Sequence, residues 1–101
     1  MTFGDVLRRL RTEAGVGIKR LAPELGVNYT YLSKLENNQI QPSADLVERV
    51  AAYFDYDRDS LLLSAGKIPV EILTILRENP EDALKFLRKH FGGNNANRRN
   101  L

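Results

Sequence analysis

Residues 18 to 36 read IKRLAPELGVNYTYLSKLE, a pattern that fits two short helices joined by a tight turn. The first half carries an apolar stripe at helical spacing, formed by Ile18, Leu21, Ala22 and Leu25. Gly26 ends this segment and permits a sharp reversal of the chain. Asn28 is a favourable N-cap for a second helix that runs to Glu36. Two short helices with a turn of three or four residues have the spacing of a helix-turn-helix.

The second of these helices separates an apolar side from a polar side. Leu32 and Leu35 face inward at helical spacing. Its outer face carries side chains that can hydrogen-bond base edges or phosphates, namely Tyr29, Thr30, Ser33 and Lys34. They gather near a helix N-terminus, where the helix dipole favours anions. The sequence therefore predicts that the helix beginning near Asn28 docks in the major groove of double-stranded DNA.

The residues before this stretch predict another helix. Thr2 opens it, with Asp5 three residues later as the partner in a capping box, and Gly15 ends it. Its inward face is predicted to consist of Phe3, Val6, Leu7, Leu10 and Ala14.

Two further helices are predicted after the central stretch. Ser43 caps the first, whose inward face is predicted to consist of Leu46, Val47, Val50, Ala51 and Phe54. The second begins at Asp57 or Asp59 and closes at Gly66. Because no useful run of strand-like alternation occurs, we expect an all-α, five-helix domain over residues 1–66.

Residues 67–92 are predicted to form an appended helical hairpin. Pro69 suits the first position of one helix, and Asn79 and Pro80 provide a cap and a first-position proline for the next. The segment from Ile68 to Leu76 is apolar nearly all round. Residues 93–101, which include Arg98 and Arg99, are polar and basic and are predicted to be a disordered tail.

The apolar surface of the hairpin exceeds what a five-helix core needs, so we interpret it as a homodimerisation element. The candidate dimerisation residues are Ile72, Ile75, Leu76 and Phe86. Two alternatives remain open from the sequence. The same helices could fold back on their own domain, or they could bind a different protein.

Several motifs between Phe3 and Ala65 resemble the lambda-repressor-like helix-turn-helix proteins, also called the XRE family. The resemblance is carried by Leu7-Arg8-Arg9-Leu10-Arg11, Ala14-Gly15-Val16, Leu21-Ala22, Leu25-Gly26-Val27, the run from Tyr31 to Asn37, and Pro42-Ser43. It implies a five-helix fold and binding of DNA through the second helix of the motif. The homodimer inferred from the C-terminal helices matches this function, because two recognition helices about one turn of DNA apart, ~34 Å, can read a palindrome.

The resemblance also implies roles for individual positions. Residues that would read bases are Tyr29, Thr30 and Lys34, and residues at cap or backbone-contact positions beside them are Asn28, Tyr31 and Ser33. Asn37 and Asn38 fall where the following loop approaches phosphates, and Lys19 joins the candidate DNA-binding set. Glu36 matches a residue that pairs with an arginine of the first helix, which would be Arg11 here.

The sequence departs from the family pattern in three places. Gly17 and Ile18 replace the usual Ser or Thr followed by Gln, and we expect Ile18 to pack in the core rather than brace the recognition helix. Pro23 lies inside the second helix, which it should kink or shorten. Tyr29 stands where Gln or Arg is common, so a simple bidentate base contact is not expected there.

The composition argues against an enzyme, so we expect no catalytic residues, cofactor or metal. The chain has no cysteine, which removes disulfides and thiolate metal sites. His90 is the only histidine, and its place near the end of the last predicted helix suits a partner of the helix dipole. Asp55, Asp57 and Asp59 lack the glycine and distal glutamate of a calcium loop and are expected to cap helices.

The distribution of charged and apolar residues along the chain indicates which partners and which compartment to expect. Basic residues outnumber acidic ones near both ends of the chain, while residues 43–82 are acidic, which suits contact with phosphates at selected places. No secretory signal is visible, and no apolar run reaches the ~20 residues of a membrane span, so we expect a cytoplasmic protein without membrane contact.

The sequence thus predicts a sequence-specific, double-stranded DNA-binding transcriptional regulator, in particular a repressor that binds a palindromic operator as a homodimer. The alternative is a protein-interaction module, such as an antitoxin-like or protease-controlled partner, whose C-terminal helices bind another protein.

Overall fold

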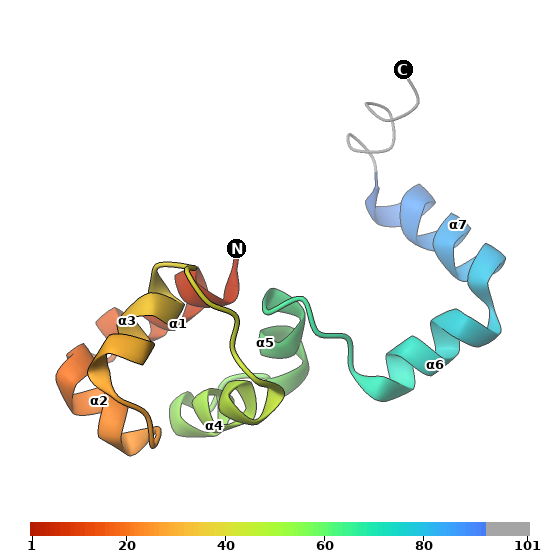
Figure 1. Cartoon of the computed structure of the whole chain (residues 1–101). Helices are drawn as coiled ribbons and strands as arrows, with labels where there is room; N and C mark the ends of the chain where they lie inside the picture. The colour runs from red at the N-terminus through yellow and green to blue at the C-terminus, as the bar shows by residue number, and fades with distance from the viewer. Residues whose placement is uncertain (93–101) are drawn as a thin grey trace. The chain divides into compact units, whose positions relative to one another are not determined.

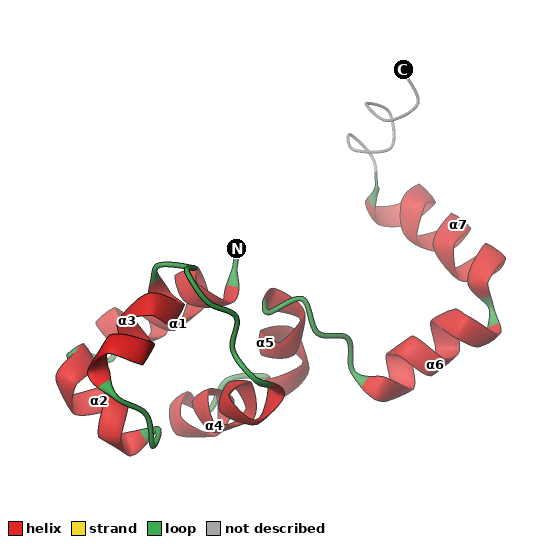
Figure 2. Ribbon diagram, viewed as in Figure 1, coloured by secondary structure: helices red, strands yellow, loops and turns green. Residues whose placement is uncertain are grey.

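The computed structural model describes residues 1–92, which form seven α-helices without any strand (Figures 1 and 2). The all-α architecture predicted from the sequence is therefore confirmed. The chain divides into two compact units, residues 1–68 and a second unit that begins at Pro69. Within residues 1–92, none of the helices is long and apolar enough to cross a lipid bilayer. The predicted tail, residues 93–101, lies outside the described residues.

Helix α1 (Phe3–Glu13) begins at the predicted capping box. The Thr2 hydroxyl oxygen accepts a hydrogen bond from the backbone N–H of Asp5, and the Asp5 carboxylate accepts one from the backbone N–H of Thr2, both at 3.3 Å. Ala14 was predicted to face inward but is exposed. The reason is that the helix ends at Glu13 and the chain turns away at Gly15, whose φ is +69°.

Helices α2 (Ile18–Glu24) and α3 (Tyr29–Glu36) flank a four-residue turn, residues 25–28. Gly26 adopts φ +73° within this turn, a left-handed conformation that glycine reaches without a steric cost. Pro23 lies inside α2 and offers no backbone N–H, and the helix ends one residue later. The expected shortening of this helix by Pro23 agrees with these bounds.

Helices α4 (Ala44–Phe54) and α5 (Arg58–Ser64) complete the first unit. Ser43 caps α4, since its hydroxyl oxygen accepts from the backbone N–H of Leu46 at 3.1 Å. Asp57, rather than Asp59, caps α5 by accepting from the backbone N–H of Ser60 at 2.9 Å. Asp55 ends α4 in the left-handed conformation, with φ +52°.

One apolar core holds these five helices together. Its buried members are Phe3, Val6, Leu7, Leu21, Ala22, Leu25, Leu32, Leu35, Leu46, Val47, Val50, Ala51, Leu61 and Leu62. Every one of the five helices contributes, and full burial of one large apolar side chain stabilises a fold by about 1.5–3 kcal/mol. Packing of these short helices against one another therefore outweighs their weak individual propensities.

The second unit contains α6 (Val70–Glu78) and α7 (Pro80–Phe91), joined at a sharp bend (Figure 1). Pro69 is the N-cap of α6, one position before the predicted one. Neither helix has a buried residue. The His90 ring, in the last turn of α7, stacks on the Phe86 ring with 4.0 Å between their centroids.

Asn79 is the N-cap of α7, as predicted, but its side chain does not cap that helix. Both its backbone N–H and its side-chain Nδ2 donate to the carbonyl oxygen of Ile75, at 3.1 and 3.0 Å, and its side chain makes no cap bond to α7. Asn79 is the only residue between the two helices, so the free carbonyl groups at the end of α6 compete for its amide. Pro80 occupies the first position of α7, as predicted.

Candidate nucleic-acid interface

Helix α3 turns most of its polar side chains outward from the first unit. Tyr29 is 48% exposed, and Thr30 and Lys34 are exposed, while Tyr31 and Ser33 are half-buried. Leu32 and Leu35 are buried in the core, as predicted. A shallow hollow beside the helix is lined by Asn28, Thr30, Tyr31, Lys34 and Ile40. The fold therefore brings together four of the predicted DNA-binding residues on one accessible surface.

The start of α3 is fixed by its own cap. The side-chain oxygen of Asn28 accepts a hydrogen bond from the backbone N–H of Tyr31 at 2.8 Å, and Asn28 itself is extended. Such a cap is worth about 0.5–2 kcal/mol relative to alanine. Tyr29 and Thr30 are the first two residues of the helix, so they lie at the positive end of its dipole.

Lys19 and Tyr29 form a contact between α2 and α3. The Lys19 Nζ lies over the Tyr29 ring, 5.8 Å from its centroid, which is within the range of a cation–π interaction. Ile18, the neighbouring residue, is half-buried and packs against the core, as expected. Lys19 therefore contacts the first residue of α3. Ile18 stands at the position where the family pattern has a glutamine that braces the recognition helix.

The far end of α3 is fixed by a buried ion pair. Glu36 is only 2% exposed, and its two carboxylate oxygens accept from Arg11 Nε at 2.6 Å and Nη2 at 2.9 Å. Arg11 Nη1 also donates to the carbonyl oxygen of Val16 at 3.1 Å. The hydrogen bond to Glu36 raises the pKa of Arg11, against an opposing effect of burial. The pairing that the family resemblance implied is thus present, and it ties α1 to the end of α3.

A second arginine of α1, which sequence reasoning missed, reaches the same place. Arg8 Nη2 donates to the side-chain oxygen of Asn37 at 2.7 Å, and its Nε lies 3.4 Å from Glu36 Oε1. The signal in the sequence was the spacing of three residues between Arg8 and Arg11, which puts both on one face of a helix.

Gly4 is a further position that sequence reasoning missed. A Cβ built at Gly4 would lie 2.6 Å from Asn38 Oδ1 and 2.9 Å from the Glu36 carbonyl oxygen, so α1 approaches the end of α3 more closely than any side chain allows. Asn38 has φ +60° in the turn that follows α3. Only glycine permits this approach of the two backbones.

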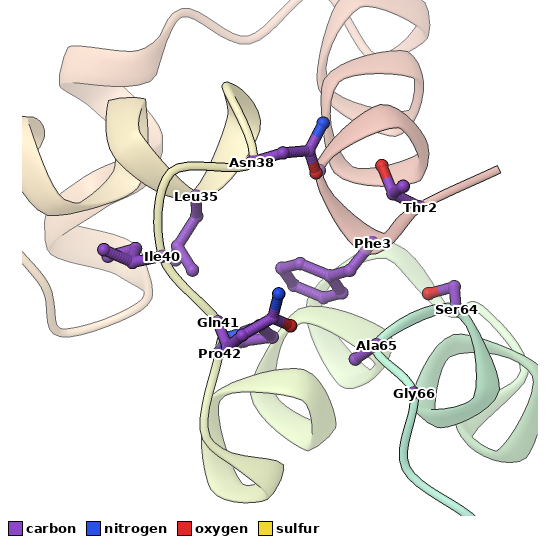
Figure 3. A pocket seen from close by; sticks show the side chains of 11 residues that line it. Thr2, Phe3, Leu35, Asn38, Ile40, Gln41, Pro42, Ser64, Ala65 and Gly66 are labelled. Atoms are coloured by element: carbon purple, nitrogen blue, oxygen red, sulfur yellow. The ribbon is translucent and has the colours of Figure 1, made fainter.

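Beside this contact lies a cavity of about 250 Å³ (Figure 3). It is formed by the start of α1, the loop after α3 and the end of α5, and its lining includes Phe3, Asn38, Gln41 and Ser64. Its lining residues carry no titratable side chain.

Arg49 of α4 fixes the turn between α2 and α3. Its Nη1 donates to the carbonyl oxygen of Leu25, the C-cap of α2, and its Nη2 lies 3.1 Å from Asp45 one turn earlier in α4. Cationic groups are favourable at helix C-termini, where carbonyl groups lack intrahelical partners. No local pattern in the sequence indicated this contact, because it joins residues 24 positions apart.

The fold has two short helices, a four-residue turn between them and an outward polar face on the second helix. These features define a helix-turn-helix protein. The family described as "Helix-turn-helix domain" matches residues 4–67, which is more than half of the chain. The chain therefore belongs to the helix-turn-helix domain family, as its resemblance to XRE proteins implied.

The curated proteins that the chain resembles are HTH-type transcriptional regulators. The chain is 37% identical over 61 residues to the HTH-type transcriptional regulator SinR of Bacillus subtilis, covering 59% of this chain and 55% of SinR. It is 33% identical over 63 residues to an uncharacterised HTH-type transcriptional regulator of Mycobacterium tuberculosis, covering 62% of this chain and 45% of that protein. The match thus spans about half the length of these curated relatives.

Two solved structures resemble the chain with a TM-score of 0.56 and 26% identity. One is the clp gene regulator ClgR from Corynebacterium glutamicum, with 88% of this chain and 89% of that chain covered. The other is a complex of the SinR and SinI proteins, with 99% of this chain and all of the matched chain covered.

Proposed function

We propose that the chain is a sequence-specific, double-stranded DNA-binding transcriptional regulator that inserts α3 into the major groove. The observation that carries this proposal is the exposed polar face of α3 on a helix fixed at both ends, by Asn28 at its start and by Arg11 and Glu36 at its end. A helix held this firmly can present side chains to base edges without first paying to order itself.

The proposed contacts divide along the helix. Tyr29, Thr30 and Lys34 read base edges, because they are exposed and carry donors or acceptors. Residues proposed to support them at the backbone are Lys19, Asn28, Tyr31, Ser33, Asn37 and Asn38. Lys34 can donate to guanine acceptors, whereas Tyr29 offers a ring for a thymine methyl group and a hydroxyl for a phosphate.

The second unit supports a homodimer. Ile72, Ile75 and Phe86 are 41%, 52% and 54% exposed, and Leu76 is half-buried. Apolar side chains gathered on two helices are a costly surface to leave in water and are typical of an interface. A two-fold dimer suits a palindromic operator, whose half-sites require two α3 helices about one turn of DNA apart, ~34 Å. We propose that the dimer acts as a repressor by occupying such an operator.

One observation favours a second candidate function. The solved complex of SinR and SinI contains a chain that matches this one over 99% of its length, including the second unit. The exposed face of α6 and α7 could then bind a different protein, as in an antitoxin-like or protease-controlled partner. Either function acts by binding rather than catalysis and would be exercised in the cytoplasm.

Selection of bound duplexes from a random pool, followed by sequencing, tests the proposal. We expect enrichment of a palindrome. On the selected site Lys34→Ala and Thr30→Ala should each cost ~1–3 kcal/mol, with a smaller effect on random DNA. Arg20→Ala, which removes an exposed charge from α2, is the matched control. Absence of any enriched sequence would contradict DNA reading, and equal losses on both DNAs would contradict base reading by Lys34.

A further inference from the structure

Arg8 and Asn37 form an exposed polar pair where α1 meets the end of α3. Arg8 Nη2 donates to Asn37 Oδ1 at 2.7 Å, although the two residues are 29 positions apart. The Arg8 side chain is 51% exposed, and Asn37 is exposed. Asn37 is the C-cap of α3, so the pair lies at the opposite end of the helix from Asn28.

The charge of Arg8 is only partly compensated. Glu36 is its acidic neighbour, at 3.4 Å, but both oxygens of that carboxylate bond Arg11 at 2.6 and 2.9 Å. Two guanidinium groups thus share one carboxylate, which leaves about one net positive charge. Because Arg11 has a side chain only 15% exposed, this excess is accessible at Arg8.

The contact also fixes the orientation of the Asn37 amide. A guanidinium group only donates hydrogen bonds, so Asn37 must turn its oxygen toward Arg8. Its Nδ2 group then carries two N–H donors directed away from Arg8. Within residues 1–92, neither Asn37 Nδ2 nor Arg8 Nη1 donates a hydrogen bond to a protein acceptor. A cationic fork and an oriented amide donor therefore stand side by side.

We infer that Arg8 and Asn37 form a phosphate-binding pair that holds one DNA backbone phosphate at the end of α3. Arg8 supplies the positive charge, and Asn37 supplies N–H donors whose direction Arg8 sets. Guanidinium and amide groups are common donors to DNA phosphates, and such contacts fix register without reading sequence. This inference rests on the proposed DNA-binding function and assigns Arg8 a part in it.

The salt dependence of binding to the selected site and to random duplex DNA tests the pair. Arg8→Ala should weaken both DNAs by the same factor and reduce the slope of log K against log salt by about 1. Arg9→Ala is the matched control, since Arg9 is an exposed neighbour on α1 whose Nη1 donates to the Met1 sulfur. It should leave the slope near the wild-type value. Equal slopes for the wild type and Arg8→Ala would overturn the inference.

Asn37→Asp separates binding from folding. The aspartate keeps an oxygen acceptor for Arg8, so the thermal midpoint should be unchanged or higher, while its charge repels the phosphate and its N–H donors are gone. We expect at least a tenfold loss of affinity on both DNAs. Unchanged affinity for this variant would also overturn the inference.

The two proposals fail differently. If the wild type binds no duplex DNA even at low salt, the proposed function itself fails, and the pair with it. If the wild type binds but Arg8→Ala behaves as Arg9→Ala, only the phosphate pair fails.

Discussion

Arg11 of α1 and the buried Glu36 of α3 form a bidentate ion pair that joins the first helix of the fold to the end of α3. The side chains of Arg11 and Glu36 are 15% and 1% exposed, so water would solvate either charge poorly if the other were removed. The pair is therefore a structural link between α1 and α3, and it would affect the proposed DNA binding only through the position of α3.

Removing one partner of this pair should destabilise the fold strongly. We expect Glu36→Leu to lower the free energy of unfolding by about 3–5 kcal/mol, because it leaves Arg11 without its counter-charge. Urea denaturation followed by circular dichroism measures this. Glu13→Leu, at an exposed acid of α1, should change stability by less than about 0.5 kcal/mol.

The double variant Arg11→Met with Glu36→Leu sharpens this test. Because it buries no unpaired charge, it should recover a large part of the stability lost in Glu36→Leu. A double variant less stable than the single variant would show that desolvated charge is not the source of the loss.

Gly4→Ala should destabilise the protein, although alanine usually improves a helix. The added Cβ would lie 2.6 Å from Asn38 Oδ1 and 2.9 Å from the Glu36 carbonyl oxygen, so the end of α3 has to move. We expect a loss of about 1–3 kcal/mol, as for overpacked sites. Chemical denaturation of the two proteins measures the difference.

Gly17→Ser provides a comparison of opposite sign. Gly17 is the N-cap of α2 in an extended conformation, makes no side-chain cap and has open space where a Cβ would stand. A serine there can cap the helix and should gain a few tenths of a kcal/mol. If both glycine replacements moved stability in the same direction, the space around each Cβ would not be what decides the outcome.

The two capping aspartates predict an acid limb of the stability profile. Hydrogen bonds from the side chain and backbone of Thr2 lower the pKa of Asp5, and those from Ser60 lower the pKa of Asp57. A carboxyl whose pKa is lower in the folded state stabilises the fold above its unfolded pKa, about 3.9, and loses that contribution as the pH falls through its folded value. Stability should thus be flat near neutral pH and fall below about pH 4.

Urea midpoints measured between pH 3 and 7 check this expectation. Asp57→Asn keeps an acceptor for Ser60 but cannot titrate. The difference in midpoint between the wild type and Asp57→Asn should shrink toward acid pH. A difference that stays constant over this range would argue against the cap as the titrating group.

The proposed dimer predicts a change of mass. Ile72→Glu with Ile75→Glu places two charges on the exposed apolar face of α6 and should yield monomers in light scattering. Thr74→Glu, at an exposed polar position of the same helix, should leave the dimer intact. A wild type that is already monomeric, or a double variant of unchanged mass, would contradict the proposal.

Local chemistry made much of the fold predictable. Thr2, Asn28 and Ser43 cap helices where the sequence placed them, since each cap depends on residues only three positions apart. Gly15, Gly26 and Gly66 adopt positive φ where helices were predicted to end. Asn79 is the N-cap of α7 as predicted, but its side chain bonds α6 instead, because a single residue serves two helix ends and spacing alone does not say which end takes the side chain.

The candidate site was predictable only in part. The outward face of α3 follows from helical spacing, and the pairing of Arg11 with Glu36 came from the family resemblance. Gly4, Arg8 and Arg49 were missed, because each acts on a residue more than 20 positions away. Such contacts depend on how the helices cross, and local periodicity carries no information about that.

The single-residue joint at Asn79 couples the rotational phase of α6 to that of α7. With both helices starting and ending at fixed residues, one inserted residue would rotate one apolar stripe by about 100° relative to the other. In the proposed homodimer, the combined surface of Ile72, Ile75 and Phe86 would then no longer fit the same surface of the second copy. In the proposed homodimer, the length of this joint would therefore help a chain to discriminate its own copies from related chains that have equally apolar helices.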